Sequence, residues 1–66
     1  MNEYRRLRLT AGKSLAEASK EIGVHISTLV NWEKGRYNPH PQRFKAIAQA
    51  YGCAMEDIVK AYAAQD

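Results

Sequence analysis

The chain has 66 residues, which is enough for one small domain but not for two. Ten Lys and Arg residues against seven Asp and Glu residues give a net charge of +3 at pH 7, a mild excess that is compatible with a nucleic-acid partner. One cysteine excludes an internal disulfide, and no apolar run approaches the roughly 18 residues of a membrane span. We therefore expect a single domain of residues 1–66, with no signal peptide and a cytoplasmic location.

Five segments have apolar residues at helical spacing, and none alternates as a strand does. The first spans residues 2–11 and ends before Gly12. The second begins at Ser14, which can form a capping box with Glu17 because each side chain can bind the free backbone N–H of the other residue. The residues expected on the inner faces of these two helices are Tyr4, Leu7, Ala11, Leu15, Ala18, Ser19 and Ile22.

A third helix is predicted at about 26–34, and residues 35–41 follow as an extended loop because two prolines interrupt them. Pro41 then fits the first turn of a fourth helix, and a fifth helix completes a core of about residues 3–60. Residues 61–66 are expected to fray. The chain therefore predicts a compact all-α domain of five helices. The residues expected on the inner faces of the last two helices are Phe44, Ile47, Ala48, Tyr51, Met55, Ile58, Val59 and Tyr62.

Only about three residues, 23–25, connect the second and third helices. A link so short, with a glycine at its start, makes the two helices cross steeply, as in a helix-turn-helix. The second helix of such a pair is the one that enters a DNA major groove. On a helical wheel, Leu29 and Trp32 point to the core while the opposite arc is small or polar. The residues of that outer arc are Ile26, Ser27, Val30, Asn31 and Lys34.

Glu33 lies near the core side of the third helix, where a buried carboxylate without a partner costs several kcal/mol. Arg8 is the best-placed partner, since it follows the inward Leu7 by one residue. The alternative is a solvated Glu33 at the helix end, where an exposed pair contributes under about 1 kcal/mol. The spacing leaves both interpretations open.

The motifs that carry a family resemblance are Leu7-Arg8, IGV at 22–24, STLVNWEKG at 27–35 and AIAQAYG at 46–52. From about Glu3 to Val59, the chain is similar to the lambda-repressor-like, Xre-type helix-turn-helix family. The resemblance implies a five-helix all-α domain that binds operator DNA, usually as a dimer. It also implies that Arg8 and Glu33 form a partly buried ion pair that braces the third helix.

The resemblance also assigns roles along the third helix. Ile26, Ser27 and Asn31 match the family's base-reading positions. Thr28, Lys34 and the loop after Gly35 match its phosphate-contacting positions. The chemistry agrees, because an Asn amide can bind adenine through two hydrogen bonds, a Ser hydroxyl can donate or accept, and an Ile side chain can pack on a thymine methyl group.

Basic and polar residues near this helix are candidates for the DNA backbone. Lys13, Ser14 and the N–H groups that open the second helix form one candidate phosphate site. The other candidates for phosphate contacts are Lys34, Arg36, Arg43 and, as a hydrogen-bond donor, Tyr37.

The chain departs from the family pattern at several positions. Leu15 stands where many relatives have a Gln that holds the DNA backbone. His25 and Ala54 replace the usual hydroxyl caps of the third and last helices. Ile26 and Val30 make the reading face more apolar than is common, which favours either methyl-rich DNA or a protein partner.

No residues indicate catalysis or a metal site. His25, His40 and Cys53 share no ligand spacing, and no nucleophile is paired with a base in a recognisable pattern. We therefore expect no enzyme activity, no cofactor and no small-molecule ligand.

The sequence predicts a sequence-specific DNA-binding transcriptional regulator of the phage-repressor kind, bacterial or phage-encoded and nucleoid-associated. We expect a homodimer on a pseudo-palindromic operator, with helix 26–34 of each protomer in the major groove about one DNA turn apart. Met55, Val59 and Tyr62 are candidates for the dimer face. Because no sensor domain follows, we expect regulation by concentration, competition or a partner. The alternative is a protein-interaction module on the same scaffold, such as an antitoxin-like or regulatory partner.

Overall fold

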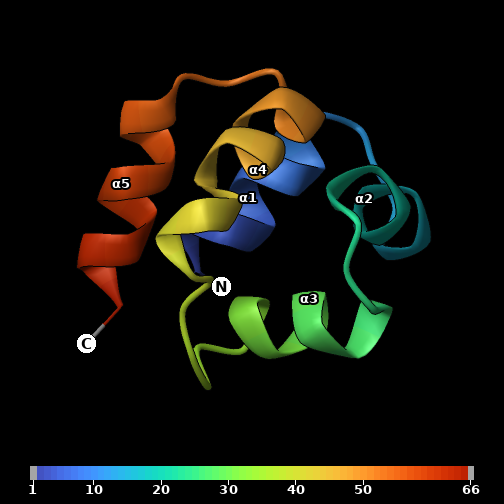
Figure 1. The fold of residues 1–66 in the computed structure, drawn as a ribbon, viewed down its shortest axis with the longest axis horizontal. Helices are drawn as coiled ribbons and strands as arrows, with labels where there is room; N and C mark the ends of the chain where they lie inside the picture. Colours follow the sequence, from blue (N-terminus) through green and yellow to red (C-terminus); the bar gives the residue numbers. More distant parts are fainter. Residues whose placement is uncertain (1, 66) are drawn as a thin grey trace.

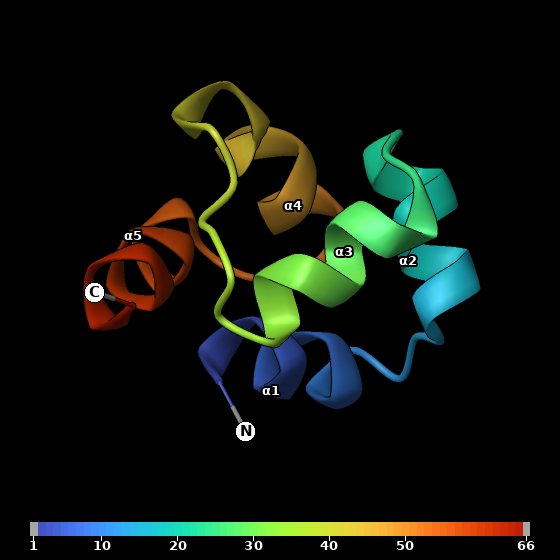
Figure 2. The same ribbon diagram turned by 90° about the horizontal axis from the view of Figure 1, so that it is seen from below.

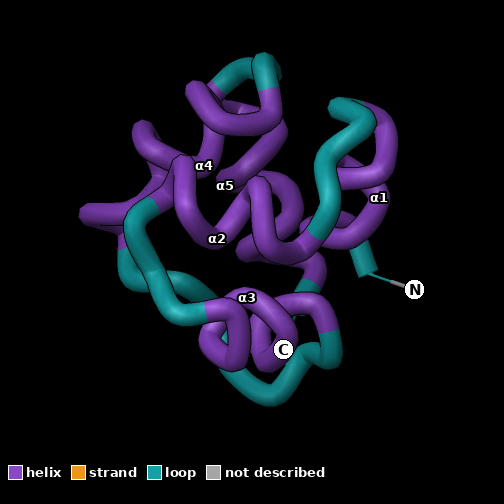
Figure 3. The backbone as a smooth tube through the Cα atoms, turned by 90° about the vertical axis from the view of Figure 1, so that its right-hand side faces the viewer, coloured by secondary structure: helices purple, strands orange, loops and turns teal. Residues whose placement is uncertain are grey.

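The computed structural model describes residues 2–65, and in this range the chain forms five α-helices, one turn of 3-10 helix and no strand (Figures 1 and 3). The predicted all-α fold is therefore confirmed. The elements are α1 (Glu3–Thr10), α2 (Leu15–Ile22), α3 (Ile26–Glu33), η1 (Pro41–Arg43), α4 (Phe44–Tyr51) and α5 (Met55–Ala64).

Helices α2 and α3 form the predicted helix-turn-helix. Figure 1 looks along α2 and across α3, so the two axes cross steeply. The crossing depends on Gly23, which ends α2 in the left-handed conformation at φ 86°, a backbone region that residues with a Cβ rarely adopt. Its N–H donates to Ser19 O at 2.9 Å and so closes the last turn of α2.

The start of α2 has the predicted capping box. Ser14 Oγ accepts a hydrogen bond from the Glu17 N–H at 3.0 Å, and Glu17 Oε1 accepts one from the Ser14 N–H at 2.9 Å. The hydrogen bonds from Ser14 hold the pKa of the Glu17 carboxyl below its usual range. The box fixes the residue at which α2 begins.

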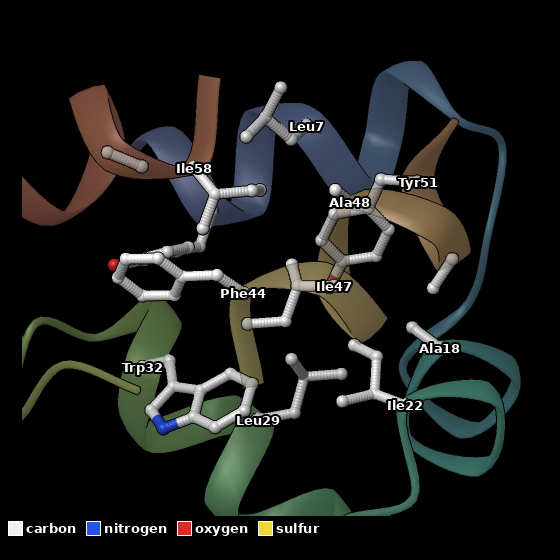
Figure 4. Packing of buried hydrophobic residues seen from close by; sticks show 13 residues of the cluster. Leu7, Ala18, Ile22, Leu29, Trp32, Phe44, Ile47, Ala48, Tyr51 and Ile58 are labelled. Atoms are coloured by element: carbon white, nitrogen blue, oxygen red, sulfur yellow. The ribbon is translucent and has the colours of Figure 1, made fainter. Parts of the chain in front are cut away.

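The core is one cluster of apolar side chains around α4 (Figure 4). Leu29 and Trp32 extend from α3 toward Phe44 and Ile47 of α4, and Ile58 of α5 closes the other side. Burial of each large apolar side chain contributes about 1.5–3 kcal/mol. The buried apolar residues are Tyr4, Leu7, Ala18, Ile22, Leu29, Trp32, Phe44, Ile47, Ala48, Ala50, Tyr51, Ile58 and Ala61.

The predicted inner face of α5 is wrong in part. Ile58 and Ala61 are fully buried, whereas Met55, Val59 and Tyr62 are 47%, 50% and 40% exposed. The four positions chosen from the sequence share one side of the helix, but the core faces the arc between Ile58 and Ala61 instead. Ile58 lies at the edge of the predicted side, and a small alanine fills the second core position. The exposed three form a separate stripe at i, i+4 and i+7.

Two predicted boundaries also differ. Pro41 opens the 3-10 turn η1 rather than the first turn of an α-helix, and α4 begins at Phe44. In the segment 61–66 that was expected to fray, α5 continues through Ala64 and Gln65 makes tertiary hydrogen bonds. The last residue of the expected tail, Asp66, lies outside the described residues. None of the described helices has the length and apolar character that crossing a membrane requires.

Candidate nucleic-acid interface

Helix α3 has one face in the core and one on the surface. Figure 2 shows it on the near side of the molecule, with α1 and α4 on either side of it. Leu29 is 0% and Trp32 4% exposed, whereas Ile26 is 39% exposed and Ser27 is also exposed. Four further residues of α3 are partly buried, namely Thr28, Val30, Asn31 and Glu33. The two apolar anchors therefore fix which side chains α3 presents outward.

The first turn of α3 is capped by a histidine. The Nδ1 atom of His25 accepts a hydrogen bond from the Ser27 N–H at 3.1 Å and lies 2.8 Å from Ser27 Oγ. A ring nitrogen that accepts a hydrogen bond carries no hydrogen of its own to donate. The Ser27 hydroxyl then donates to His25, so its remaining capacity toward a partner is that of an acceptor. The sequence did not predict this restriction.

Asn31 is held at both ends of its amide. Its Nδ2 donates to Tyr37 Oη at 2.8 Å, and its Oδ1 accepts from Arg36 Nη1 at 2.9 Å. Arg36 and Tyr37 were expected at phosphates, and here they orient the expected base-reading side chain. An amide has two donor hydrogens and two acceptor lone pairs. Asn31 therefore keeps one donor and one acceptor for an adenine edge.

The structure joins Arg8 and Glu33 in a two-pronged ion pair between α1 and α3. Arg8 Nε donates to Glu33 Oε2 at 2.7 Å and Arg8 Nη2 to Glu33 Oε1 at 3.0 Å. The two side chains are only 8% and 7% exposed. Arg8 Nη1 also donates to the Lys13 carbonyl at 2.9 Å, so the guanidinium is well satisfied. The solvated alternative for Glu33 is therefore excluded.

The start of α2 differs from the expected phosphate site. Lys13 forms an ion pair with Glu21, and the N–H of Ser14 donates to Glu17 rather than remaining free. A phosphate at this position would meet the carboxylates of Glu17 and Glu21. The structure therefore does not present Lys13 and Ser14 as free phosphate ligands.

The other cations expected at the backbone lie on the surface. Lys34 caps the C-terminal end of α3, Arg36 follows in the loop, and Arg43 ends the turn η1. Among residues 2–65, none of the three takes part in an ion pair. They remain available for an anionic partner.

A network of polar side chains, which the sequence did not predict, lies beside the C-terminal end of α3. Asn2 Nδ2 donates to the Trp32 carbonyl at 2.6 Å and to Gln65 Oε1. Gln65 Nε2 in turn donates to Asn38 Oδ1 at 2.8 Å, and Tyr4 Oη donates to the same oxygen at 3.1 Å. The network ties both ends of the described chain to the loop after α3. Its members are up to 63 residues apart, and no local pattern relates them.

The part of the chain that the structure describes contains no group of three metal-ligating side chains. Cys53 is partly buried, and this burial raises the pKa of its thiol. A protonated, partly buried thiol is a poor nucleophile.

The sequence of the chain is similar to known proteins. A family model described as helix-turn-helix matches residues 5–58. The chain belongs to this helix-turn-helix family, which is the lambda-repressor-like family that its motifs resemble. Members are DNA-binding transcriptional regulators rather than enzymes, in line with the expected absence of catalytic activity.

Two similar proteins come from Archaeoglobus fulgidus, and each is named an uncharacterized HTH-type transcriptional regulator. One is 35% identical over 54 residues, which cover 82% of this chain and 77% of that protein. The other is 40% identical over 42 residues, which cover 64% of this chain and 59% of that protein. No solved structure gave a significant match.

Proposed function

We propose that this protein is a sequence-specific regulator that binds operator DNA by inserting α3 into the major groove. The observation that supports this most strongly is the two-sided build of α3. Leu29 and Trp32 fill the core from one side, so the opposite side presents small and polar groups on a fixed backbone. A rigid helix of this kind suits the major groove, which is wide enough to admit an α-helix.

In this proposal three side chains of α3 read bases. Asn31 binds an adenine edge through its free donor and acceptor, Ser27 accepts a hydrogen bond from a base amino group, and Ile26 packs on a thymine methyl group. The support for Asn31 is its fixed amide, which Arg36 and Tyr37 hold in one orientation. A side chain that is already oriented loses less conformational entropy on binding.

Cations and hydroxyls around α3 would contact phosphates. Among the described residues, Lys34 and Arg43 form no ion pair. Arg36 keeps further N–H donors after its bond to Asn31. Thr28 and Tyr37 can add hydrogen bonds to phosphate oxygens. Each phosphate neutralised steepens the salt dependence of binding by about 0.9 in the log–log slope.

We further propose a homodimer on a pseudo-palindromic operator in the cytoplasm, with two copies of α3 about one DNA turn apart. The exposed stripe of Met55, Val59 and Tyr62 on α5 supports a protein contact there. Such a stripe at helical spacing is the form that a helix–helix interface takes.

The second candidate is a protein-interaction module. Its support is the exposed Ile26 beside the half-buried Val30, which could dock an apolar partner instead of DNA. Binding driven by apolar contact depends weakly on salt, whereas binding to phosphates depends on it strongly.

The two candidates are separated by selecting bound duplexes from random DNA and measuring affinity against salt by fluorescence anisotropy. The proposal predicts an enriched motif and a Kd that rises steeply with salt. Lys34→Ala should weaken binding to all duplexes alike and make the slope shallower. Lys60→Ala, which removes an exposed cation of α5, is the matched control and should change neither. No enriched motif, or binding insensitive to salt, would favour the second candidate.

A further inference from the structure

A surface hollow lies at the C-terminal end of α3. Its volume is about 640 Å³, and its wall is built from three elements: α1, the last turn of α3 and the loop that follows. Arg5 comes from α1, Lys34 from the end of α3 and Arg36 from the loop. The residues that line it are Asn2, Arg5, Glu33, Lys34, Gly35 and Arg36.

The charge of this hollow is strongly positive. Its single carboxylate, Glu33, is already neutralised by two hydrogen bonds from Arg8. Within residues 2–65, the ion pairs are Arg6 with Glu3, Arg8 with Glu33 and Lys13 with Glu21. None of them uses the three lining cations. The hollow therefore gathers three positive charges that the described part of the chain does not compensate.

The hollow continues along the flank of the outward face of α3. A smaller depression of about 190 Å³ shares Arg5 and Lys34 with it and reaches Leu15 and Val30. Val30 belongs to the outer arc of α3, next to the residues proposed to read bases. An anion held by the three cations would therefore lie beside the reading helix and not on a remote surface.

We propose that Arg5, together with Lys34 and Arg36, binds a phosphodiester group of the DNA backbone beside the reading helix. This inference rests on the proposed DNA binding and adds a contact from α1, where no DNA-contacting residue was expected. Two guanidinium groups and an ammonium suit the ligand, because a guanidinium can bind two phosphate oxygens through parallel N–H bonds. The exposed Arg5 side chain can turn toward such a group without disturbing the core.

Arg6 provides a matched control for Arg5. It is the next residue of the same helix and is also exposed, but it donates three hydrogen bonds to Glu3, at 3.1, 3.0 and 2.7 Å. Arg5→Ala and Arg6→Ala each remove one exposed cation and change the net charge equally. A difference between them in DNA binding reports on position and not on overall charge.

The test measures affinity for the selected operator by fluorescence anisotropy at several salt concentrations. Arg5→Ala should make the log–log salt slope shallower by about 0.9 per bound protomer. The ratio of the Kd of Arg5→Ala to the Kd of the intact protein should therefore fall about 3.5-fold per bound protomer between about 50 and 200 mM salt. Arg5→Lys should keep most of the slope, and Arg6→Ala should leave it unchanged. Melting temperatures of all variants verify that the fold is intact.

Four outcomes overturn the inference. An unchanged slope in Arg5→Ala, alongside a shallower slope in Lys34→Ala, would remove Arg5 from the interface and leave the proposed function standing. Equal effects of Arg5→Ala and Arg6→Ala would assign the effect to net charge. Saturable binding of inorganic phosphate that Arg5→Ala abolishes, without any change in the operator slope, would make the hollow a site for free anions. If the intact protein binds no duplex, both the inference and the proposed function fail.

Discussion

Glu33 receives two hydrogen bonds from the guanidinium of Arg8, although the two residues lie 25 positions apart in the sequence. The pair joins the last turn of α3 to the last turn of α1, and both side chains are almost completely buried. A two-pronged contact fixes rotation as well as distance. The pair therefore helps to set the direction in which α3 presents its outer face.

Breaking this pair from one side should be costly. Arg8→Ala leaves a buried carboxylate without its partner, which typically costs about 3–5 kcal/mol. A domain of this size has a total stability of roughly 3–10 kcal/mol, so the variant should lose a large part of its stability and should be unfolded at ambient temperature if the total lies in the lower part of that range. The double variant Arg8→Met/Glu33→Leu should recover much of the loss, because no unpaired charge remains. Urea denaturation followed by circular dichroism measures both, and an unchanged midpoint in Arg8→Ala would contradict a structural role for the pair.

The amide network behind α3 should stabilise the chain ends. Asn38 Oδ1 accepts from Tyr4 Oη and from Gln65, so Asn38→Ala leaves the hydroxyl of the buried Tyr4 without this partner. We expect a loss of about 1–3 kcal/mol. Amide hydrogen exchange should also become faster in the last turn of α5, since Asn38 Nδ2 donates to the Tyr62 carbonyl at 3.3 Å.

The control for this variant is Gln42→Ala, which truncates an exposed amide of η1 that makes no side-chain hydrogen bond among the described residues. It should leave both stability and exchange unchanged. Equal exchange rates in the two variants would show that the network does not hold the end of α5.

The start of α5 offers a stabilising substitution. Ala54 occupies the N-cap with φ −78° and ψ 152° but has no side-chain acceptor, so only the Asp57 half of a capping box is present, at 3.1 Å. Ala54→Ser should complete the box and add about 0.5–1 kcal/mol. Thermal denaturation measures the gain. The same change at the exposed Ala63 inside α5 should lower stability slightly, because serine is a weaker helix former than alanine.

Two buried tyrosines should make the fold sensitive to alkali. Burial raises the pKa of Tyr4 to about 12, with a smaller effect from Tyr62, and burial also raises the pKa of Tyr51, with the charge of Glu33 adding to it. In the unfolded chain these hydroxyls ionise near pH 10. The folded pKa values lie above the unfolded one, so their contribution to stability is complete below about pH 10 and is lost as the pH rises through about 12.

The measurement is the melting temperature against pH together with tyrosinate absorbance. Both should change together above about pH 10, because ionisation of the buried rings accompanies unfolding. Tyr51→Phe should reduce the fall in melting temperature at alkaline pH and should change the melting temperature little at neutral pH. Its Oη is buried and has no hydrogen-bond partner among the described residues. A melting temperature constant from pH 9 to 12 would be incompatible with these pKa directions.

The sequence predicted features whose causes are local. The Ser14 capping box, the glycine that ends α2 and the inward faces of α3 and α4 follow from spacing within one or two turns. These features decide that Leu29 and Trp32 face the core. The direction of the outer face of α3 was therefore predictable from the chain alone.

Features that depend on distant partners were not predictable. Nothing near Lys13 shows that Glu21 would compensate its charge, and nothing near Asn38 indicates its bonds to Tyr4 and Gln65. Likewise, the engagement of Asn31 by two loop residues depends on how the chain turns back after Gly35. The sequence therefore identified the candidate surface but not which of its side chains are already bound to one another.

The central claim is that α3 reads bases with its outer face, and base discrimination by Asn31 tests it most directly. The affinities of the intact protein and of Asn31→Ala are measured for the selected operator and for duplexes with each base pair of a half-site replaced. The intact protein should lose about 1–3 kcal/mol at one adenine position, and Asn31→Ala should lose its preference at that position alone. An Asn31→Ala variant that keeps the full preference at every position would contradict the claim.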